Sequence, residues 1–305
     1  MQIRRFHELA HHEFENVTLT MGNFDGVHRG HIELLARAKN SAQAHGGLSA
    51  VLTFDPHPVS LFKPGSFRLI QPLEERIEKI RSSGVDLCSV MEFTRDVADI
   101  SARDFVEKIL RSRFGFRELI VGFNTTFGKN RAGTPETLKS MGYQQGFAVT
   151  VVDPVMIRNE PVSSSRIRRA IQAGDITLAN ELLGYCYRVA GTVVKGYGRG
   201  GVLGYPTANL DLGGRLIPHS GVFAAWVTRG AQRFRGAVSI GTNPTFDNQE
   251  SSLEVFLLDF EENLYGERLG LEFVTFLRDM QRFENKGELK TQLARDVEAV
   301  RHVLR

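Results

Sequence analysis

VTLTMGNFDGVHRGH, residues 17–31, decides the fold of the amino-terminal half. A short apolar run is followed by a glycine-containing turn and then, at 32–44, by an amphipathic stretch, which is the order strand, loop, helix. Further apolar runs follow at 48–54, 85–91, 118–123 and 147–152. This alternation predicts an α/β fold with a parallel sheet and helices on both of its faces. Ligands of such sheets bind beyond the carboxyl ends of the strands, where the strand order reverses.

Amphipathic segments at 73–81 and 102–114 are expected to form further helices. Ser101, with Asp104 three residues later, resembles a capping box at the start of the second of these. Helical patterning returns in SSSRIRRAIQAG at 163–174 and in ITLANELLG at 176–184.

From residue 187 onward the chain reads as strands separated by glycine-rich turns. The strand-like runs are GVFAAWV at 221–227, RGAVSIG at 235–241, LEVFLLDF at 253–260 and LGLEFVTFL at 269–277. Their spacing predicts an antiparallel barrel or sandwich. We therefore expect two domains, 1–185 and 186–305. The last domain should end in a helix whose packing face carries Leu289, Leu293, Val297, Val300 and Leu304.

The composition is that of an ordinary globular protein. The chain has 305 residues, of which 42% are hydrophobic and 24% charged, enough for two cores and too apolar for wholesale disorder. A net charge of +3 without basic blocks among aromatics argues against a nucleic-acid partner. Cys88 and Cys186 stand far apart, and no apolar run suits a signal peptide or a membrane span. We therefore expect a cytoplasmic protein with no membrane partner.

The motif H-x-G-H, formed by His28, Gly30 and His31, carries the first candidate chemistry. Two histidines three apart in the first helical turn lie on one face, beside unpaired backbone N–H groups and the positive end of the helix dipole. Gly30 has no Cβ, so a nucleotide can approach the backbone closely. These features favour a phosphate site with two extra donors over a helix start with solvated histidines.

This motif resembles that of the nucleotidylyltransferase superfamily, whose members hold the triphosphate of an NTP with H-x-G-H. GNFDGVHRGH, FDPHP at 54–58, GFNTTFGKNRAGT at 122–134 and VSSSRIRRAI at 162–171 together are similar to the FMN adenylyltransferase module of bacterial bifunctional riboflavin kinase/FAD synthetases. The resemblance extends over nearly the whole chain. It implies a Rossmann-like domain in which His28 and His31 stabilise the leaving pyrophosphate. The substrate-binding residues that it implies are Gly22, Asn23, Phe24, Asp25 and Gly30 in the first loop, Pro56, His57 and Asn124 on the flavin and ribose side, and Ser164, Ser165 and Arg168 near the β- and γ-phosphates.

A second constellation lies in GTVVKGYGRGGVLGYPTANL at 191–210. Its glycines, among them Gly196 and Gly198, permit a loop whose N–H groups turn toward phosphate, although no Walker lysine follows. PTAN at 206–209 resembles the riboflavin kinase signature. This implies a β-barrel kinase domain in which Thr207 and Asn209 are oxygen ligands of Mg²⁺. The stretch LRDMQRFENKGEL also resembles the flavin-contacting segment of these kinases, which implies contacts from Arg278 and Phe283.

Glu254 is the predicted catalytic residue of this half. Both alternating faces of LEVFLL are otherwise apolar, so we expect a strand buried on two sides, with Glu254 turned inward on the face of Phe256 and Leu258. An inward carboxylate is costly unless it is paired or used. The family places its catalytic glutamate at this match, and phosphorylation of a neutral hydroxyl benefits from a proton acceptor.

The resemblance implies one chain that converts riboflavin to FMN and FMN to FAD, using ATP together with Mg²⁺ in each step. Many relatives carry Asp where Asn124 stands, Thr where Ser165 stands and a basic residue where Gly201 stands, but none of these departures removes a group that the chemistry requires. One alternative is adenylylation of pantetheine phosphate or nicotinamide mononucleotide, with the barrel as a binding module, which PTAN and Glu254 argue against. Another is an RNA-binding fragment related to class I tRNA synthetases, which the even charge distribution argues against. The oligomeric state is left open.

Overall fold

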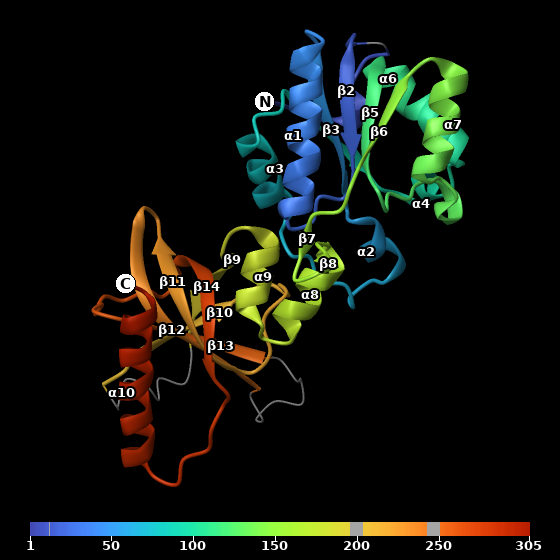
Figure 1. Cartoon of the computed structure of the whole chain (residues 1–305). Coiled ribbons are helices and arrows are strands. Elements are labelled where there is room, and N and C mark those ends of the chain that lie inside the picture. Colours follow the sequence, from blue (N-terminus) through green and yellow to red (C-terminus); the bar gives the residue numbers. More distant parts are fainter. Residues whose placement is uncertain (12, 196–203, 243–250) are drawn as a thin grey trace. The chain divides into compact units, whose positions relative to one another are not determined.

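The structure, a computed structural model, describes residues 1–11, 13–195, 204–242 and 251–305 (Figure 1). The chain divides into two compact units, Met1–Ser164 and Ser165–Arg305. The boundary that we expected at residue 185 lies further along the chain, after helices α8 (Ser164–Gln172) and α9 (Ile176–Leu183). The difference arises because α9 packs on the strands of the second unit. The Asn180 side chain donates to the carbonyl of Phe273 at 2.8 Å and accepts from the backbone N–H of Tyr187 at 2.7 Å.

The first unit is built on a parallel sheet with the strand order β1-β4-β3-β2-β5-β6. All five strands expected from the apolar runs are present, and one more, β1, forms an edge. The strand order reverses between β2 and β5, as a doubly wound sheet requires. The strands are β1 (Gln2–Arg5), β2 (Val17–Met21), β3 (Leu48–Asp55), β4 (Leu87–Glu92), β5 (Phe116–Gly122) and β6 (Ala148–Val152).

Helices cover both faces of this sheet, which confirms the predicted α/β architecture (Figure 1). The expected helix at 102–114 is present but changes its winding, because its central part is a π-helix at Phe105–Arg111. The Ser101 hydroxyl accepts the N–H of Asp104 at 3.0 Å and so caps its start. The helices of the unit are η1 (Phe6–Glu8), α1 (Arg29–Ala44), α2 (Pro58–Phe62), α3 (Leu73–Ser82), α4 (Arg95–Ala98), α5 (Ala102–Asp104), η2 (Phe105–Arg111), α6 (Ser112–Phe114), η3 (Lys129–Arg131) and α7 (Pro135–Gln145). A short hairpin, β7 (Met156–Ile157) and β8 (Glu160–Pro161), precedes α8.

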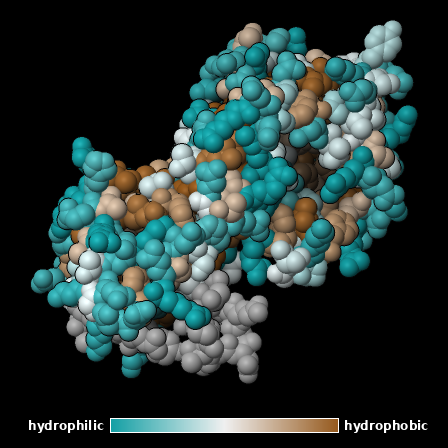
Figure 2. Space-filling view, turned by 60° about the horizontal axis from the view of Figure 1, so that its bottom comes forward, coloured by the Kyte–Doolittle hydropathy of each residue, from teal (hydrophilic) through white to brown (hydrophobic). Residues whose placement is uncertain are grey.

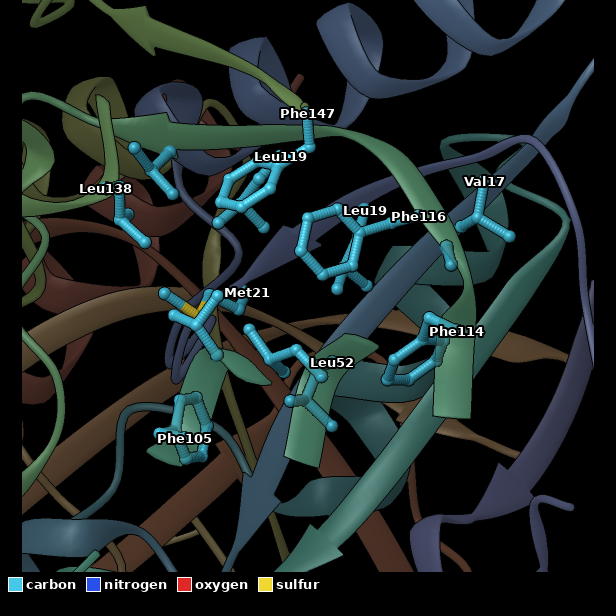
Figure 3. Close-up of a cluster of buried hydrophobic side chains, with 14 of the residues drawn as sticks. Val17, Leu19, Met21, Leu52, Phe105, Phe114, Phe116, Leu119, Leu138 and Phe147 are labelled. Atoms are coloured by element: carbon cyan, nitrogen blue, oxygen red, sulfur yellow. The ribbon is translucent and has the colours of Figure 1, made fainter. Parts of the chain in front are cut away.

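The larger core of the unit lies on one face of the sheet (Figure 3). There Leu19 and Met21 of β2 and Leu52 of β3 pack against Phe105 and Leu138 from the covering helices. On the opposite face Leu35 of α1 and Ile80 of α3 join Phe24, Val27 and Val51. Because β2 contributes to the core and the loop after it is buried as well, the position of that loop is set by packing.

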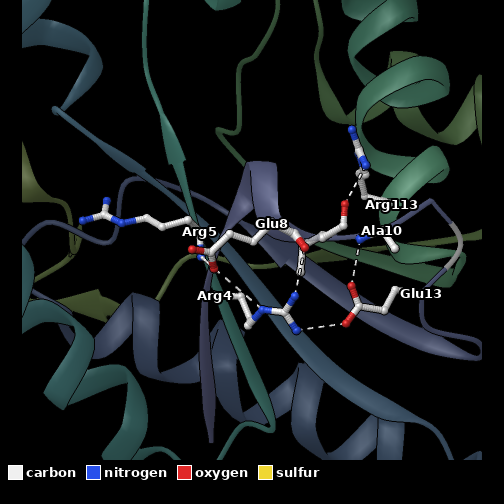
Figure 4. A network of polar contacts seen from close by, with 7 residues as sticks. Arg4, Arg5, Glu8, Ala10, Glu13 and Arg113 are labelled. Atoms are coloured by element: carbon white, nitrogen blue, oxygen red, sulfur yellow. Dashed lines mark hydrogen bonds and ion pairs between the residues drawn. The ribbon is translucent and has the colours of Figure 1, made fainter.

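The edge strand β1 pairs with β4, and polar contacts tie it to the segment that follows it (Figure 4). The Arg4 guanidinium donates to the Glu13 carboxylate and to the carbonyl of Glu8, both at 2.9 Å. Glu13 in turn accepts the backbone N–H of Ala10 at 2.8 Å. QIRR contains a single apolar residue, Ile3, so the strand could not be found from hydrophobic patterning.

The second unit is a closed antiparallel barrel with the strand order β10-β13-β12-β11-β14-β9. Because the sheet closes on itself, the unit is a barrel and not a sandwich, the other architecture that the strand spacing allowed. The interior is filled, because the Phe223 and Phe273 rings meet edge to face at 5.7 Å and Tyr187 stacks near Phe273 at 6.2 Å. The strands are β9 (Tyr187–Val194), β10 (Thr207–Asp211), β11 (Gly221–Arg229), β12 (Gln232–Thr242), β13 (Ser251–Leu257) and β14 (Arg268–Arg278).

The final helix, α10 (Lys286–Val303), packs on the outside of the barrel wall. Val297, Val300 and Leu304 of the predicted stripe join a cluster with Trp226 and Phe256. Leu289 and Leu293 lie nearer the start of the helix and are half-buried. The predicted stripe therefore packs mainly through its second half.

Hydrophilic side chains cover most of the face of the molecule shown in Figure 2, with small hydrophobic areas between them. Within the described residues, no helix combines the length and the apolar character needed to cross a bilayer.

Candidate active sites

Three loops singled out in the sequence follow three neighbouring strands of the parallel sheet. Met21 ends β2 before the H-x-G-H loop, Asp55 ends β3 before Pro56 and His57, and β5 ends before Asn124. The strand β2 lies between β3 and β5. Since parallel neighbours end at the same edge, the three loops gather there, at the point where the strand order reverses.

The loop between β2 and α1 has an unusual backbone. Phe24 and Val27 have φ values of 50° and 30°, in a region that L-residues with bulky or branched side chains rarely adopt. Both side chains are fully buried in the core under α3. The buried Asp25 carboxylate accepts the backbone N–H groups of Ile70 and Gln71, the nearest at 3.1 Å and 3.0 Å. Packing and these bonds hold a strained loop in place, as is typical of functional sites.

His28 and His31 lie together at the start of α1. His28 is the N-cap, and its Nδ1 accepts the backbone N–H of His31 at 3.3 Å. The two rings stack with their centroids 3.6 Å apart and an interplanar angle of 15°. The Phe24 ring lies 5.1 Å from that of His31 on centroids. The strained loop therefore brings both imidazoles to the amino end of a helix, where an anion is stabilised.

Both imidazoles resist protonation. Burial lowers the pKa of His28 from 6.5 to about 4. Burial also lowers the pKa of His31 well below 6.5, and the charges of His28 and Arg76 add to this effect. The buried Nδ1 of His31 has no hydrogen-bond partner within the part of the chain that the structure describes. At neutral pH the stacked pair is uncharged, and the buried Nδ1 of His31 keeps an unmet hydrogen-bonding capacity.

The glycines and Ser164 shape this loop. A Cβ on Gly30 would lie 3.2 Å from Cε1 of His28, and one on Gly22 would lie 3.3 Å from the Phe24 ring. A side chain at either position would therefore press on the neighbouring ring. The Ser164 hydroxyl donates to the Asp25 carbonyl at 2.8 Å, which ties the start of α8 to the loop.

We expect acid to destabilise the first unit through His28. In the unfolded chain His28 takes a proton as the pH falls through 6.5, whereas the folded protein resists protonation until about pH 4. The contribution of the neutral ring is therefore complete above pH 6.5 and is lost between 6.5 and 4, by about 3 kcal/mol for a shift of this size. Chemical denaturation followed by circular dichroism at pH 7 and pH 4 measures the loss. The variant His28→Asn keeps a side chain that caps the helix but has no imidazole to titrate. Its loss of unfolding free energy between pH 7 and pH 4 should therefore be smaller than that of the unmodified chain by about 3 kcal/mol. An equal loss in both proteins would contradict this assignment.

The other predicted residues of this half have local partners. His57 is the N-cap of α2, accepts the N–H of Val59 at 3.1 Å, and stacks on Phe67 with centroids 4.5 Å apart. Asn124 is exposed in the turn after β5. On α8, Ser165 is exposed and Arg168 half-buried. The ligand-binding roles of these residues stay predictions.

One residue at this edge was missed in the sequence. Arg76 of α3 is 1% exposed, and its guanidinium donates to the carbonyls of Asn23 at 2.7 Å and Phe54 at 3.0 Å. An arginine in an amphipathic helix ordinarily indicates a solvent-facing position, so the helical pattern alone could not find it.

In the barrel unit, Thr207, Asn209 and Glu254 lie together. Asn209 of β10 is paired in register with Glu254 of β13, and Thr207 is two residues away on the same face. The Thr207 hydroxyl donates to the Glu254 carboxylate at 3.0 Å. Glu254, which is far from Thr207 and Asn209 in the sequence, is thus brought next to them on the barrel wall.

The expectation that Glu254 points inward was wrong. Leu253, Val255 and Leu257 are the buried residues of β13, and they pair with the buried Val238 and Ile240 of β12, so these positions face the barrel interior. Glu254 has the opposite orientation and is half-buried on the outer face. It does share that face with Phe256, which α10 covers. The strand is apolar on both faces because the helix packs outside it, and not because both faces enter the barrel.

A cation site at this spot would depend on oxygen donors. Among the residues that the structure describes, no three His, Cys, Asp or Glu side chains form a group that could hold a metal ion. The Thr207 hydroxyl and the Asn209 amide oxygen are hard ligands of the kind that suit Mg²⁺ when a substrate phosphate completes the coordination.

The remaining predicted residues of the barrel unit are placed as follows. The Arg278 guanidinium forms a two-bond pair with the buried Asp296 of α10, at 2.8 Å and 2.7 Å. Arg278 thus connects β14 to the final helix, and its proposed flavin contact stays a prediction. Phe283 is half-buried in the segment before α10. Gly196 and Gly198 lie outside the described residues.

Comparison with known proteins assigns the family. Residues 10–166 match the family model for FAD synthetase, and residues 183–304 match the model for riboflavin kinase. The chain is 37% identical over 291 residues to the bifunctional riboflavin kinase/FMN adenylyltransferase of Listeria monocytogenes, covering 94% of this chain and 92% of that protein. The chain belongs to the bifunctional riboflavin kinase/FMN adenylyltransferase family. The strained loop and both histidines fall within the first matched region, and the Thr207–Glu254 contact falls within the second.

Other members of the family are similar over almost their whole length. The Pseudomonas fluorescens protein of the same name is 37% identical, covering 98% of this chain and 96% of that one. The Escherichia coli K12 protein is 34% identical, covering 96% and 95%. A solved Streptococcus pneumoniae structure, titled a macrolide-efflux protein, has a TM-score of 0.88 at 32% identity and covers 97% of both chains. The family pattern therefore extends through both units.

Proposed function

We propose that the parallel-sheet unit transfers the adenylyl group of ATP to FMN, and that the barrel unit transfers the γ-phosphoryl group of ATP to riboflavin. The observation that carries the proposal is the buried, neutral His28–His31 stack at the amino end of α1, beside the reversal of strand order. A separate hydroxyl, amide and carboxylate in the other matched region supports a second reaction of different chemistry.

In adenylyl transfer an oxygen of the FMN phosphate attacks the α-phosphorus of ATP. A P–O bond to FMN forms, the bond from the α-phosphorus to the bridging oxygen breaks, and pyrophosphate leaves. The attacking phosphate is already ionised at neutral pH, so no general base is needed. His28 and His31 donate hydrogen bonds to the charge that develops on the pyrophosphate, and the positive end of the α1 dipole favours the same charge.

In phosphoryl transfer a neutral hydroxyl of riboflavin attacks the γ-phosphorus of ATP. The bond to the β-γ bridging oxygen breaks, ADP leaves, and the hydroxyl proton must be taken up. Glu254 accepts this proton, and the bond from Thr207 orients its carboxylate. Being half-buried on the outer wall, Glu254 is reachable by a substrate that could not enter the filled barrel.

We propose Mg²⁺ as the cation of both steps, with Thr207 and Asn209 as its protein ligands in the barrel unit. The ion would neutralise the charge of the ATP phosphates during transfer. We also propose that the protein works in the cytoplasm, since free cysteines such as Cys88 and Cys186 suit a reducing compartment.

Incubation of the full chain with riboflavin, ATP and Mg²⁺ tests the proposal directly. A chromatogram should show FMN first and FAD after it, and FMN supplied alone with ATP should yield FAD and pyrophosphate. Unchanged riboflavin together with FAD formation from FMN would remove the kinase assignment. If neither flavin reacts, adenylylation of pantetheine phosphate or nicotinamide mononucleotide becomes the reaction to assay.

A further inference from the structure

Arg76 is a buried cation with an unusual position in the first unit. Its guanidinium bonds to the Asn23 carbonyl just after β2 and to the Phe54 carbonyl near the end of β3. These strands are neighbours, and both end at the edge where the candidate site lies. A single side chain from α3 therefore connects the ends of the two strands that carry the H-x-G-H loop and the His57 loop.

The segment around Arg76 holds the strained loop at two points. Asn23 is held by Arg76, and two residues later the Asp25 carboxylate is held by the N–H groups of Ile70 and Gln71. Between them stands Phe24, with its positive φ. The backbone conformation that brings His28 to the helix start thus depends on contacts from residues 70–76.

Packing alone does not account for an arginine here. An apolar cluster on this face includes Leu35, Ile80 and Val85, while the carboxylates of Asp25 and Asp55 act on the guanidinium. Burying a charged group in such surroundings costs free energy that an apolar side chain of similar volume would avoid. Moreover, the buried Nε of Arg76 lacks a hydrogen-bond partner among residues 1–11, 13–195, 204–242 and 251–305. The role of the cation therefore lies in the hydrogen bonds that its N–H groups donate and in its positive charge.

We propose that Arg76 is a positioning residue for adenylyl transfer, which holds the loop between β2 and α1 in the conformation that presents His28 and His31. This inference rests on the proposed function of the first unit. Arg76 acts through the loop carbonyl and not by touching substrate.

The charge of Arg76 supports the same role. It contributes to lowering the pKa of His31, after burial and the effect of His28. The groups that act on the guanidinium itself are Asp25, Asp55, Cys88 and Glu74, all of which favour its charged form, while burial disfavours it. Since an arginine stays protonated in proteins, the site contains a fixed positive charge next to neutral imidazoles. Removing that charge should let the pKa of His31 rise toward 6.5.

Two variants of the full chain test the inference. Arg76→Met keeps the length of the side chain but removes the donors and the charge, whereas Arg76→Lys keeps a charge and donors. Arg81→Met is the matched control, because Arg81 lies on the same helix, is exposed, and pairs with the nearby Glu78 on the surface of α3. Each variant is assayed for FAD formation from FMN, for FMN formation from riboflavin, and for the His31 titration by imidazole NMR.

We expect Arg76→Met to lower kcat for FAD formation by about 100-fold, the size of effect that an ångström-scale misplacement produces. The KM values for FMN and ATP should change by a smaller factor than kcat. The pKa of His31 should rise. The rate of FMN formation from riboflavin should equal that of the unmodified chain. Arg76→Lys should recover most of the kcat for FAD formation that Arg76→Met loses. Its His31 should keep a pKa well below 6.5. Arg81→Met should match the unmodified chain in all three measurements.

Two results would overturn the inference. One is unchanged FAD formation and an unchanged His31 titration in Arg76→Met. The other is an equal loss in Arg76→Lys and Arg76→Met, each with an unfolded first unit by circular dichroism, because that would make Arg76 a residue of stability alone. If the unmodified chain itself makes no FAD, the proposed function fails instead, and the His31 titration still reports whether Arg76 sets the state of the pair.

Discussion

Replacing His28 and His31 together by alanine is expected to lower FAD formation from FMN by at least about 1,000-fold, while FMN formation from riboflavin stays within about twofold. The two rings stack at 3.6 Å and lie at the start of α1, so they act on the same developing charge. Losing one preorganised donor typically costs a factor of about 100 to 1,000 in such sites. Steady-state assays of both reactions on one preparation measure the two rates.

The controls of this experiment are internal to the chain. His45→Ala removes an exposed imidazole at the other end of α1 and should leave both rates unchanged. Since His28 is also the N-cap, the double variant loses about 1 kcal/mol of helix stability, and circular dichroism should show that it is folded. A folded double variant that still makes FAD at the normal rate would refute the role of the pair. Loss of both activities in a folded protein would refute the division of labour between the units.

Replacing Glu254 by glutamine is expected to lower FMN formation by about 100-fold to 10,000-fold and to leave FAD formation from supplied FMN unchanged. Glutamine has the same shape and can still bond to Thr207, but it cannot accept the proton of the riboflavin hydroxyl. The adenylyl step needs no base, so the second activity should not respond. Phosphorylation of riboflavin, followed by the appearance of FMN on a chromatogram, measures the first rate.

Glu262→Gln is a matched control for this variant. Glu262 is an exposed carboxylate of the same unit and pairs with Arg229 at 2.7 Å, far along the chain from the PTAN strand. It should leave FMN formation unchanged. If Glu254→Gln phosphorylates riboflavin as fast as the unmodified chain, the proton must go elsewhere, and Glu254 would be only a partner of Thr207.

Much of the fold could be predicted from local pattern. The apolar runs of the parallel strands are unambiguous because both faces of such a sheet are covered, and the barrel strands stand at regular spacing. The strand β1 was not predicted, because Arg4 and Arg5 are two of its four residues and an edge strand this short has no apolar pattern. The helices α8 and α9 were assigned to the first domain because helical pattern does not reveal which sheet a helix packs against.

The sequence motifs indicated which residues form the candidate sites, but they did not indicate how those residues are oriented or what surrounds them. H-x-G-H indicated the histidine pair, but periodicity carries no sign of the positive φ at Phe24 or of the buried Arg76 beneath it. The face of Glu254 was assigned wrongly because an apolar outer face of a barrel, covered by a helix, has the same alternation as an interior one. Arg278 was interpreted as a ligand contact, although its strong partner, Asp296, lies on a helix that follows later in the chain.

The alternation along β13 has an evolutionary consequence. Val255 and Leu257 lie in the packed interior, while Glu254 and Phe256 lie on the outer wall. Adjacent residues of one strand are therefore expected to be under different selection. A substitution at Glu254 can change the reaction with little effect on folding, whereas Phe256 also packs in the cluster under α10. An insertion of one residue in the strand would move every later side chain to the opposite face. The outer carboxylate would then point into the hydrophobic interior of the barrel, and the protein would lose stability.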